Sequence, residues 1–253
     1  MSQNKILFRG QRKAMIVACA VQIEPEFGFK LGEFTTYARK KLKPTSIDAR
    51  TSFSLLLHFK EGNYTIDISH ESITYYGFGY ETWLKQKDAF FSLISEFAKQ
   101  FDTESFQRLG FYVESYFQLD MTRKEISSLL HDSLLSTKES FPPNLGTIYD
   151  GQTVLWFEGE DYKHKTSITS MNHDDVWTTL SSNSRAITRL NKGMPQSVIE
   201  FFSQFERKKS VLNVNIDLFI EDWKFSNLDR IKDGYLENEA DDLMNTLKKM
   251  IAP

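Results

Sequence analysis

The sequence has only one cysteine, Cys19, which stands inside the apolar run AMIVACAVQI. One thiol cannot form an intramolecular disulfide, and a zinc site built on cysteines needs several of them. An apolar run is also not the electropositive turn that activates a catalytic cysteine. Disulfide scaffolds and cysteine-based zinc sites are therefore excluded, and a reducing compartment is expected.

No apolar run reaches the length of about 18 residues that a membrane-spanning helix needs. The first thirteen residues, MSQNKILFRGQRK, also lack the apolar core of a cleavable signal peptide. Lysine and arginine (31) are fewer than aspartate and glutamate (34), so the net charge of -3 gives no overall positive field for nucleic acid. We expect a cytoplasmic protein that spans no membrane, and the net charge does not indicate nucleic acid as a partner.

The common catalytic motifs GxSxG, HExxH and GxxxxGK[ST] are missing as well. Residues 77–80 (GFGY) leave two interpretations open. They could form an anion site at a helix N-terminus, but they lack the third glycine and the basic partner of such sites, which favours a simple strand-to-helix turn. We assign no catalytic, metal or cofactor-binding residue.

Aromatic residues are abundant, with 21 Phe, 10 Tyr and 4 Trp. In a chain of this length they predict a core or an interface rich in large rings. A protein partner or self-association is therefore expected.

Residues 1–104 read as strand, helix, three strands, helix. The strands are expected at 14–23, 52–59, 64–69 and 72–78, and a helix at 31–43 ends before Pro44. The second helix is expected at 81–101. Its residues at helical spacing are Trp83, Lys87, Phe90, Ile94 and Phe97, and Leu93 widens the apolar stripe.

Residues 108–120 (RLGFYVESYFQLD) open a second unit that repeats this order. Apolar and polar residues alternate along them, which predicts a half-buried strand. Tyr112, Glu114 and Tyr116 fall on its outward side, where tyrosines could contact a partner at low entropic cost. These three residues are our predicted partner-binding surface.

The second unit continues with a helix opened by a Thr122 and Glu125 capping box. Short strands are expected at 147–149, 153–158 and 165–169, a helix after Pro195, and a strong strand at 211–220. Ser226 and Asp229 are expected to cap a last helical region that Gly234 splits, and residues 171–193 are ambiguous between helix and loop.

The repeated order predicts an α+β protein with two pseudo-equivalent halves, 1–104 and 105–253, packed as one globular unit. Each half would be an antiparallel sheet with helices on one face. A saddle like the duplicated sheet of TATA-binding proteins fits this order in shape.

Two stretches resemble the TIGR04255 family, bacterial proteins of unknown function. Gly79, Tyr80 and Trp83 open a long helix before the strand beginning Arg108-Leu109-Gly110-Phe111, and residues 213–219 (NVNIDLF) precede an acidic helix. The resemblance implies at most a toxin–antitoxin or phage-defence context.

Two groups of polar residues are candidate metal ligands. The first is His164, His173, Asp174 and Asp175, and the second is Asp217, Glu221 and Asp222. Neither spacing matches a ligand motif. A turn with an N-capping aspartate explains the first group better, and a solvent-facing strand explains Asp217. His58, inside an apolar strand, is expected to be structural.

Two functions follow from these patterns. The first is a non-catalytic binding or adaptor protein, and the alternative is a metal-dependent hydrolase or nuclease-like effector. Carboxylates and histidines that converge would favour the effector, and exposed apolar rings would favour the adaptor.

Overall fold

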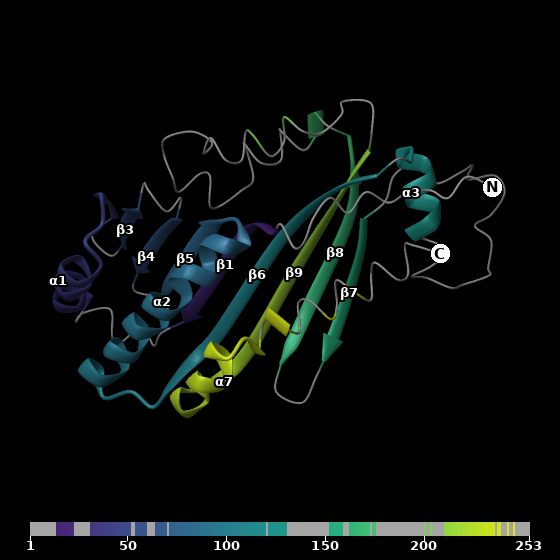
Figure 1. The fold of residues 1–253 in the computed structure, drawn as a ribbon. Coiled ribbons are helices and arrows are strands. Elements are labelled where there is room, and N and C mark those ends of the chain that lie inside the picture. Colours follow the sequence, from purple (N-terminus) through teal and green to yellow (C-terminus); the bar gives the residue numbers. More distant parts are fainter. Residues whose placement is uncertain are drawn as a thin grey trace.

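A computed structural model describes residues 14–22, 31–51, 54–59, 64–69, 71–119, 121–130, 152–158, 162–172 and 210–235, together with 174, 175, 200, 203, 237, 238, 242 and 245. Within these residues the protein is α+β, with one open antiparallel sheet and a few helices (Figure 1). The expected strand at 147–149, the helix after Pro195 and most of the ambiguous segment lie outside the described residues.

The described sheet has nine strands in the order β2-β3-β4-β5-β1-β6-β9-β8-β7, and each neighbouring pair is antiparallel. Two long strands, β6 and β9, pair along almost their whole length, from Ser105 opposite Lys224 to Leu119 opposite Ser210. The strands are β1 Ala14–Gln22, β2 Ser46–Thr51, β3 Ser54–Phe59, β4 Tyr64–Ser69, β5 Ser72–Phe78, β6 Ser105–Leu119, β7 Gln152–Glu158, β8 Lys163–Met171 and β9 Ser210–Lys224.

The helix α2 (Tyr80–Phe101) lies on one face of the sheet (Figure 1). Its predicted apolar stripe is confirmed, since Trp83, Phe90, Leu93, Ile94 and Phe97 are all buried. The helices α1 (Leu31–Leu42) and α7 (Leu228–Lys232) contact α2, and α3 (Arg123–Leu130) contacts β8. The core therefore lies between the sheet and α2.

Local signals predicted some helix ends and missed others. The capping box of α3 is confirmed, because Thr122 N donates to Glu125 Oε2 at 2.7 Å and Glu125 N donates to Thr122 Oγ1 at 3.3 Å. Gly234 has φ of 89° just after α7, as the predicted break requires. The cap of α7 by Ser226 is wrong: Asn227 is the N-cap, and its side chain makes no capping hydrogen bond.

The strand β2 (Ser46–Thr51) was not predicted. It pairs with β3 at the edge of the sheet, where Ile47 lies opposite Leu57. Its sequence, SIDART, has little β propensity, so pairing with β3 makes it a strand rather than its own composition.

Candidate functional site

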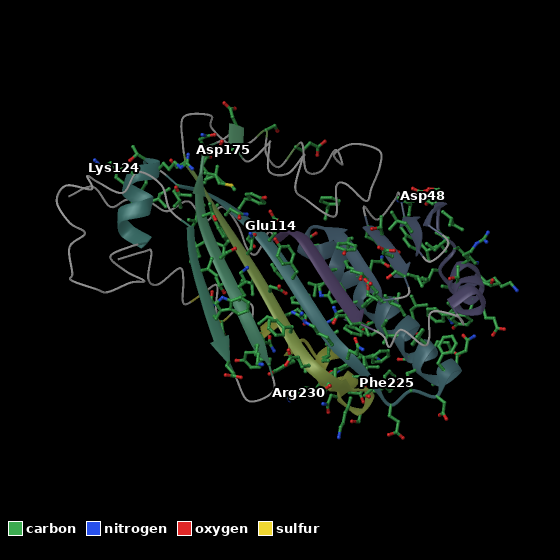
Figure 2. All side chains as sticks on the ribbon, turned by 180° about the vertical axis from the view of Figure 1, so that it is seen from behind. Asp48, Glu114, Lys124, Asp175, Phe225 and Arg230 are labelled. Carbon is green, nitrogen blue, oxygen red and sulfur yellow. The ribbon has the colours of Figure 1, made fainter. Side chains whose placement is uncertain are left out.

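The predicted partner surface lies on the face of β6 that points away from α2. On the α2 side, Phe111 packs against Trp83 with ring centroids 5.6 Å apart. Side chains alternate along a strand, so Tyr112, Glu114 and Tyr116 share the opposite face. Figure 2 shows the molecule from that side, with Glu114 labelled on β6.

The three side chains form one hydrogen-bonded group. Tyr112 Oη donates to Glu114 Oε2 at 3.1 Å, and Tyr116 Oη donates to Glu114 Oε1. Asn213, the register partner of Tyr116 on β9, also hydrogen-bonds Glu114. The carboxylate is thus satisfied by neighbours on its own strand and the next.

This group is not the open surface that alternation predicted. Glu114 is only 8% exposed and Tyr116 only 3%, and only Tyr112 is half-buried. The reason is that a central strand of a wide sheet can be buried on both faces, and polar residues tolerate burial when they satisfy one another. Tyr112 is therefore the only one of the three with appreciable exposure for a partner.

Burial raises the pKa of Glu114 above its ordinary value of 4.5, while hydrogen bonds from Tyr116, Tyr112 and Asn213 act in the opposite direction. Burial, together with the nearby Glu114 carboxylate, raises the pKa of Tyr116 far above the usual phenol range. The Tyr116 phenol therefore stays protonated and remains a donor.

Exchanging Glu114 for Gln is expected to change how stability depends on pH. A carboxyl whose pKa is raised by folding stabilises the fold most at pH below its unfolded pKa, and this contribution is lost as pH rises through the folded pKa. As pH rises above 4.5, the ordinary pKa of this carboxyl, the unfolding free energy of Glu114→Gln should therefore rise relative to that of the wild type. Urea denaturation at several pH values measures the difference.

Glu125 provides a control of opposite sign. It is exposed, and its pKa is lowered by the backbone and hydroxyl hydrogen bonds from Thr122. Its stabilising contribution is present above its ordinary pKa and is lost as pH falls, so Glu125→Gln should weaken the protein relative to wild type as pH rises. If both variants followed the same trend, the burial effect assigned to Glu114 would be contradicted.

The same face continues from β6 across β9 and β8 to β7. One row of register partners is Tyr112, Asp217, Lys165 and Trp156, and the next is Glu114, Asn215, Ser167 and Val154. At the β7 end, the Trp156 side chain is 66% exposed and Val154 is 40% exposed. Lys165 Nζ lies 5.5 Å from the centre of the Trp156 ring, a cation–π distance.

Sequence reasoning missed Trp156 and Val154 as candidate contact residues. Both stand in the expected strand 153–158 (TVLWFE), two positions apart, so they had to share a face. The position of β7 at the end of the described sheet could not be read from the sequence.

In the first group of candidate metal ligands, which includes His164 and Asp175, the structure shows Asp175 bound to other protein groups. Asn172 N donates to Asp175 Oδ2 at 3.4 Å and Asp175 N donates to Asn172 Oδ1 at 2.8 Å, while Arg123 forms an ion pair with Asp175 at 3.4 Å. Asp174 is exposed, His164 belongs to β8, and His173 lies outside the described residues. Asp175 therefore helps to organise a turn against α3.

The second group is spread along β9. Asp217 is half-buried beside Lys165 in the register, and Glu221 Oε2 pairs with Lys163 Nζ at 3.4 Å. Asp222 is exposed and has φ of 48°. Among the described residues there is no cluster of three or more histidine, cysteine or carboxylate side chains that could hold a metal ion.

Two smaller predictions also have an outcome. Gly79 alone lies between β5 and α2 and has φ of 83°, so residues 77–80 are the junction of a strand and a helix, as predicted. His58 is buried on β3.

In the described part of the chain, no helix is long and apolar enough to cross a membrane.

Comparison with known proteins adds no identification. No family model matches the chain, and no curated protein matches it. The resemblance to the TIGR04255 family stays a prediction from Gly79, Tyr80 and Trp83, the strand opened by Arg108, and residues 213–219.

Proposed function

We propose that this is a non-catalytic binding or adaptor protein that holds a protein partner on the sheet face opposite α2, at its β7 end. The observation that carries the proposal is the exposure of two apolar side chains there, Trp156 and Val154. Tryptophan is enriched among the residues that dominate binding energy at protein interfaces. A largely exposed tryptophan on a strand that pairs with β8 is suited to such a role.

The charges around Trp156 favour a protein over a polyanion. Lys163 pairs with Glu221 at 3.4 Å and with Glu158 at 3.9 Å, and Lys165 lies over the Trp156 ring beside Asp217. Each lysine thus has an acidic or aromatic neighbour. A nucleic-acid surface would instead carry uncompensated basic groups.

Tyr112, on the central strand β6 of the same face, is a second residue that could contact the partner. Its hydroxyl is held by Glu114, so the ring is ordered before a partner arrives. An ordered aromatic side chain loses little entropy on binding. Trp156 and Tyr112 lie in one row across four strands, which suits an extended contact.

The order of the strands also supports a duplicated architecture. In residues 14–78 the first strand, β1, pairs with the last, β5; in residues 105–224 the first strand, β6, pairs with the last, β9. β1 and β6 then pair with each other in the middle of the sheet. We infer two pseudo-equivalent halves that together could curve as a saddle, like the duplicated sheet of TATA-binding proteins.

The family resemblance suggests where a partner would be found. A cytoplasmic component of a toxin–antitoxin or phage-defence system would be encoded beside its partner. The alternative effector function would require a dispersed site built on Asp217, with other carboxylates such as Glu221 and with His164 or His173. The ion pair of Glu221 with Lys163 gives that carboxylate a different neighbour.

The proposal is tested by co-purification with gene neighbours expressed in the native host. Trp156→Ser should reduce recovery of the partner by roughly tenfold or more, because a tryptophan that becomes buried in an interface is among the costliest residues to lose. Leu84→Ser is the matched control, since Leu84 is 44% exposed but lies on α2. Equal recovery with the two variants, or loss of folding by circular dichroism in Trp156→Ser alone, would contradict the proposed surface.

A further inference from the structure

We propose that the β7 end of the sheet receives a second copy of this chain, through antiparallel pairing of β7 with β7. This inference rests on the proposed binding function, because it uses the same two exposed side chains, Trp156 and Val154. β7 is the last strand of the sheet in the described part of the chain, and two of its exposed side chains, Val154 and Trp156, are apolar. A strand at the edge of a sheet offers backbone N–H and C=O groups for pairing with another chain.

The sequence of β7 is self-complementary in one register. In a two-fold symmetric antiparallel pair centred on Leu155, Trp156 lies opposite Val154 of the second copy, and Val154 opposite its Trp156. Glu158 then lies opposite the neutral Gln152. Both exposed apolar residues of each copy are paired, and aromatic with β-branched residues are among the favourable cross-strand pairs.

Neighbouring registers are poorer. Moving the centre to residue 156 places Val154 opposite Glu158, and moving it to residue 154 places Trp156 opposite Gln152. Each shift therefore leaves one of the two exposed apolar side chains against a polar one. Only these registers need comparison. Side chains alternate between the two faces of a strand, so a symmetric pair keeps Trp156 on its own face only when the register shifts by an even number of residues.

Charges agree with the register centred on Leu155. Lys165 contacts Trp156 within one copy, and across the pair this row continues to Val154 and then Ser167 of the second copy. The row of Lys163 and Glu158 continues to Gln152 and Thr169 of the second copy. No like charges become direct neighbours, so electrostatic repulsion does not oppose the pair.

Two strands of seven residues bury less area than a stable dimer usually does. We therefore expect a weak dimer that forms as protein concentration rises. Sedimentation equilibrium should show this dimer, and Trp156→Lys should weaken it by roughly tenfold or more. Leu84→Lys on α2 should leave the dimer unchanged.

Disulfide cross-linking tests the register. With Cys19 replaced by Ala, Val154→Cys and Trp156→Cys proteins are purified separately, checked by circular dichroism, mixed and oxidised. Directly opposed residues have Cα atoms about 4.5–5.5 Å apart, within disulfide range, whereas residues offset by two positions are too far apart. The mixture should give a covalent dimer containing one of each variant, and each variant alone should give little.

The outcomes separate this inference from the proposed function. Rapid cross-linking of one variant alone, or a monomer at every concentration, would overturn the β7 pairing. If the protein is monomeric and Trp156→Ser still loses a neighbouring gene product, the inference fails and the binding function stands. If Trp156 affects neither kind of association, both fail.

Discussion

Replacing Glu237 by alanine is expected to lower the free energy of unfolding by about 3 kcal/mol, because a buried donor, Trp83, and a half-buried one, Lys87, lose their shared acceptor. Glu237 Oε1 accepts from the Trp83 indole Nε1 at 3.1 Å and from Lys87 Nζ at 3.3 Å. Glu237 is 5% exposed and Trp83 is 1% exposed. Water cannot replace the lost acceptor without opening the contact between this segment and α2.

Lys87 keeps one partner in this variant, the carbonyl oxygen of Lys232 at 3.0 Å. The expected loss is therefore at the lower end of the range for breaking a buried ion pair. Glu237→Gln retains an acceptor for the Trp83 indole and should cost less than Glu237→Ala. Urea denaturation followed by circular dichroism measures both.

The ion pair of Glu221 with Lys163 offers a matched control on the surface. Both side chains are exposed, so Glu221→Ala should cost less than about 1 kcal/mol. A double-mutant cycle of Glu237→Ala with Trp83→Phe should give a coupling free energy well above zero, since each change removes the hydrogen bond between the two side chains. If Glu237→Ala were as mild as Glu221→Ala, the segment around residue 237 would not be anchored to α2.

Much of the sheet could be predicted because period-two patterns are local. The alternation of Leu109, Phe111 and Val113 with Tyr112 and Glu114 correctly assigned the two faces of β6, and the same held for β9. The stripe on α2 was equally readable at helical spacing. Strands whose existence depends on a neighbour, such as β2, carry no such signal.

The candidate site was only partly predictable. Alternation placed Tyr112, Glu114 and Tyr116 together, but a pattern of residues does not say whether the second face of a strand is open or buried. Glu114 shows the difference, since its carboxylate is buried and satisfied by phenols. Exposure of Trp156 likewise depends on where β7 lies in the sheet, which is set by long-range pairing.

Contacts between distant residues were beyond reach for the same reason. Trp83 was predicted as a core residue of α2, yet its hydrogen-bond partner is 154 residues away in the sequence. Single-sequence periodicity contains no information on that pairing. Burial was therefore predicted more successfully from the sequence than the hydrogen-bond partners of the buried polar groups.

Gly77→Ala is expected to cost about 2–3 kcal/mol, because the ring of Tyr75 occupies the space that a side chain at Gly77 would need. A Cβ atom built at Gly77 would lie 2.1 Å from Tyr75 Oη and 2.6 Å from its Cζ, far inside van der Waals contact. The ring cannot move aside easily. It is fully buried and packs against Trp83, Tyr64 and Phe90 with centroid distances of 5.0, 5.5 and 6.0 Å.

Two further variants show whether this collision is the cause. Tyr75→Phe removes the closest atom and should recover part of the loss in Gly77→Ala, while Tyr75→Leu, which also removes Cζ, tests the remaining contact. Gly32→Ala is the matched control: no atom lies within 4 Å of its added Cβ, and Gly32 is in α1. Since alanine has the higher helix propensity by about 1 kcal/mol, Gly32→Ala should stabilise the protein. Thermal and urea unfolding measure the set, and a Gly77→Ala protein as stable as the wild type would mean that Tyr75 has another place to pack.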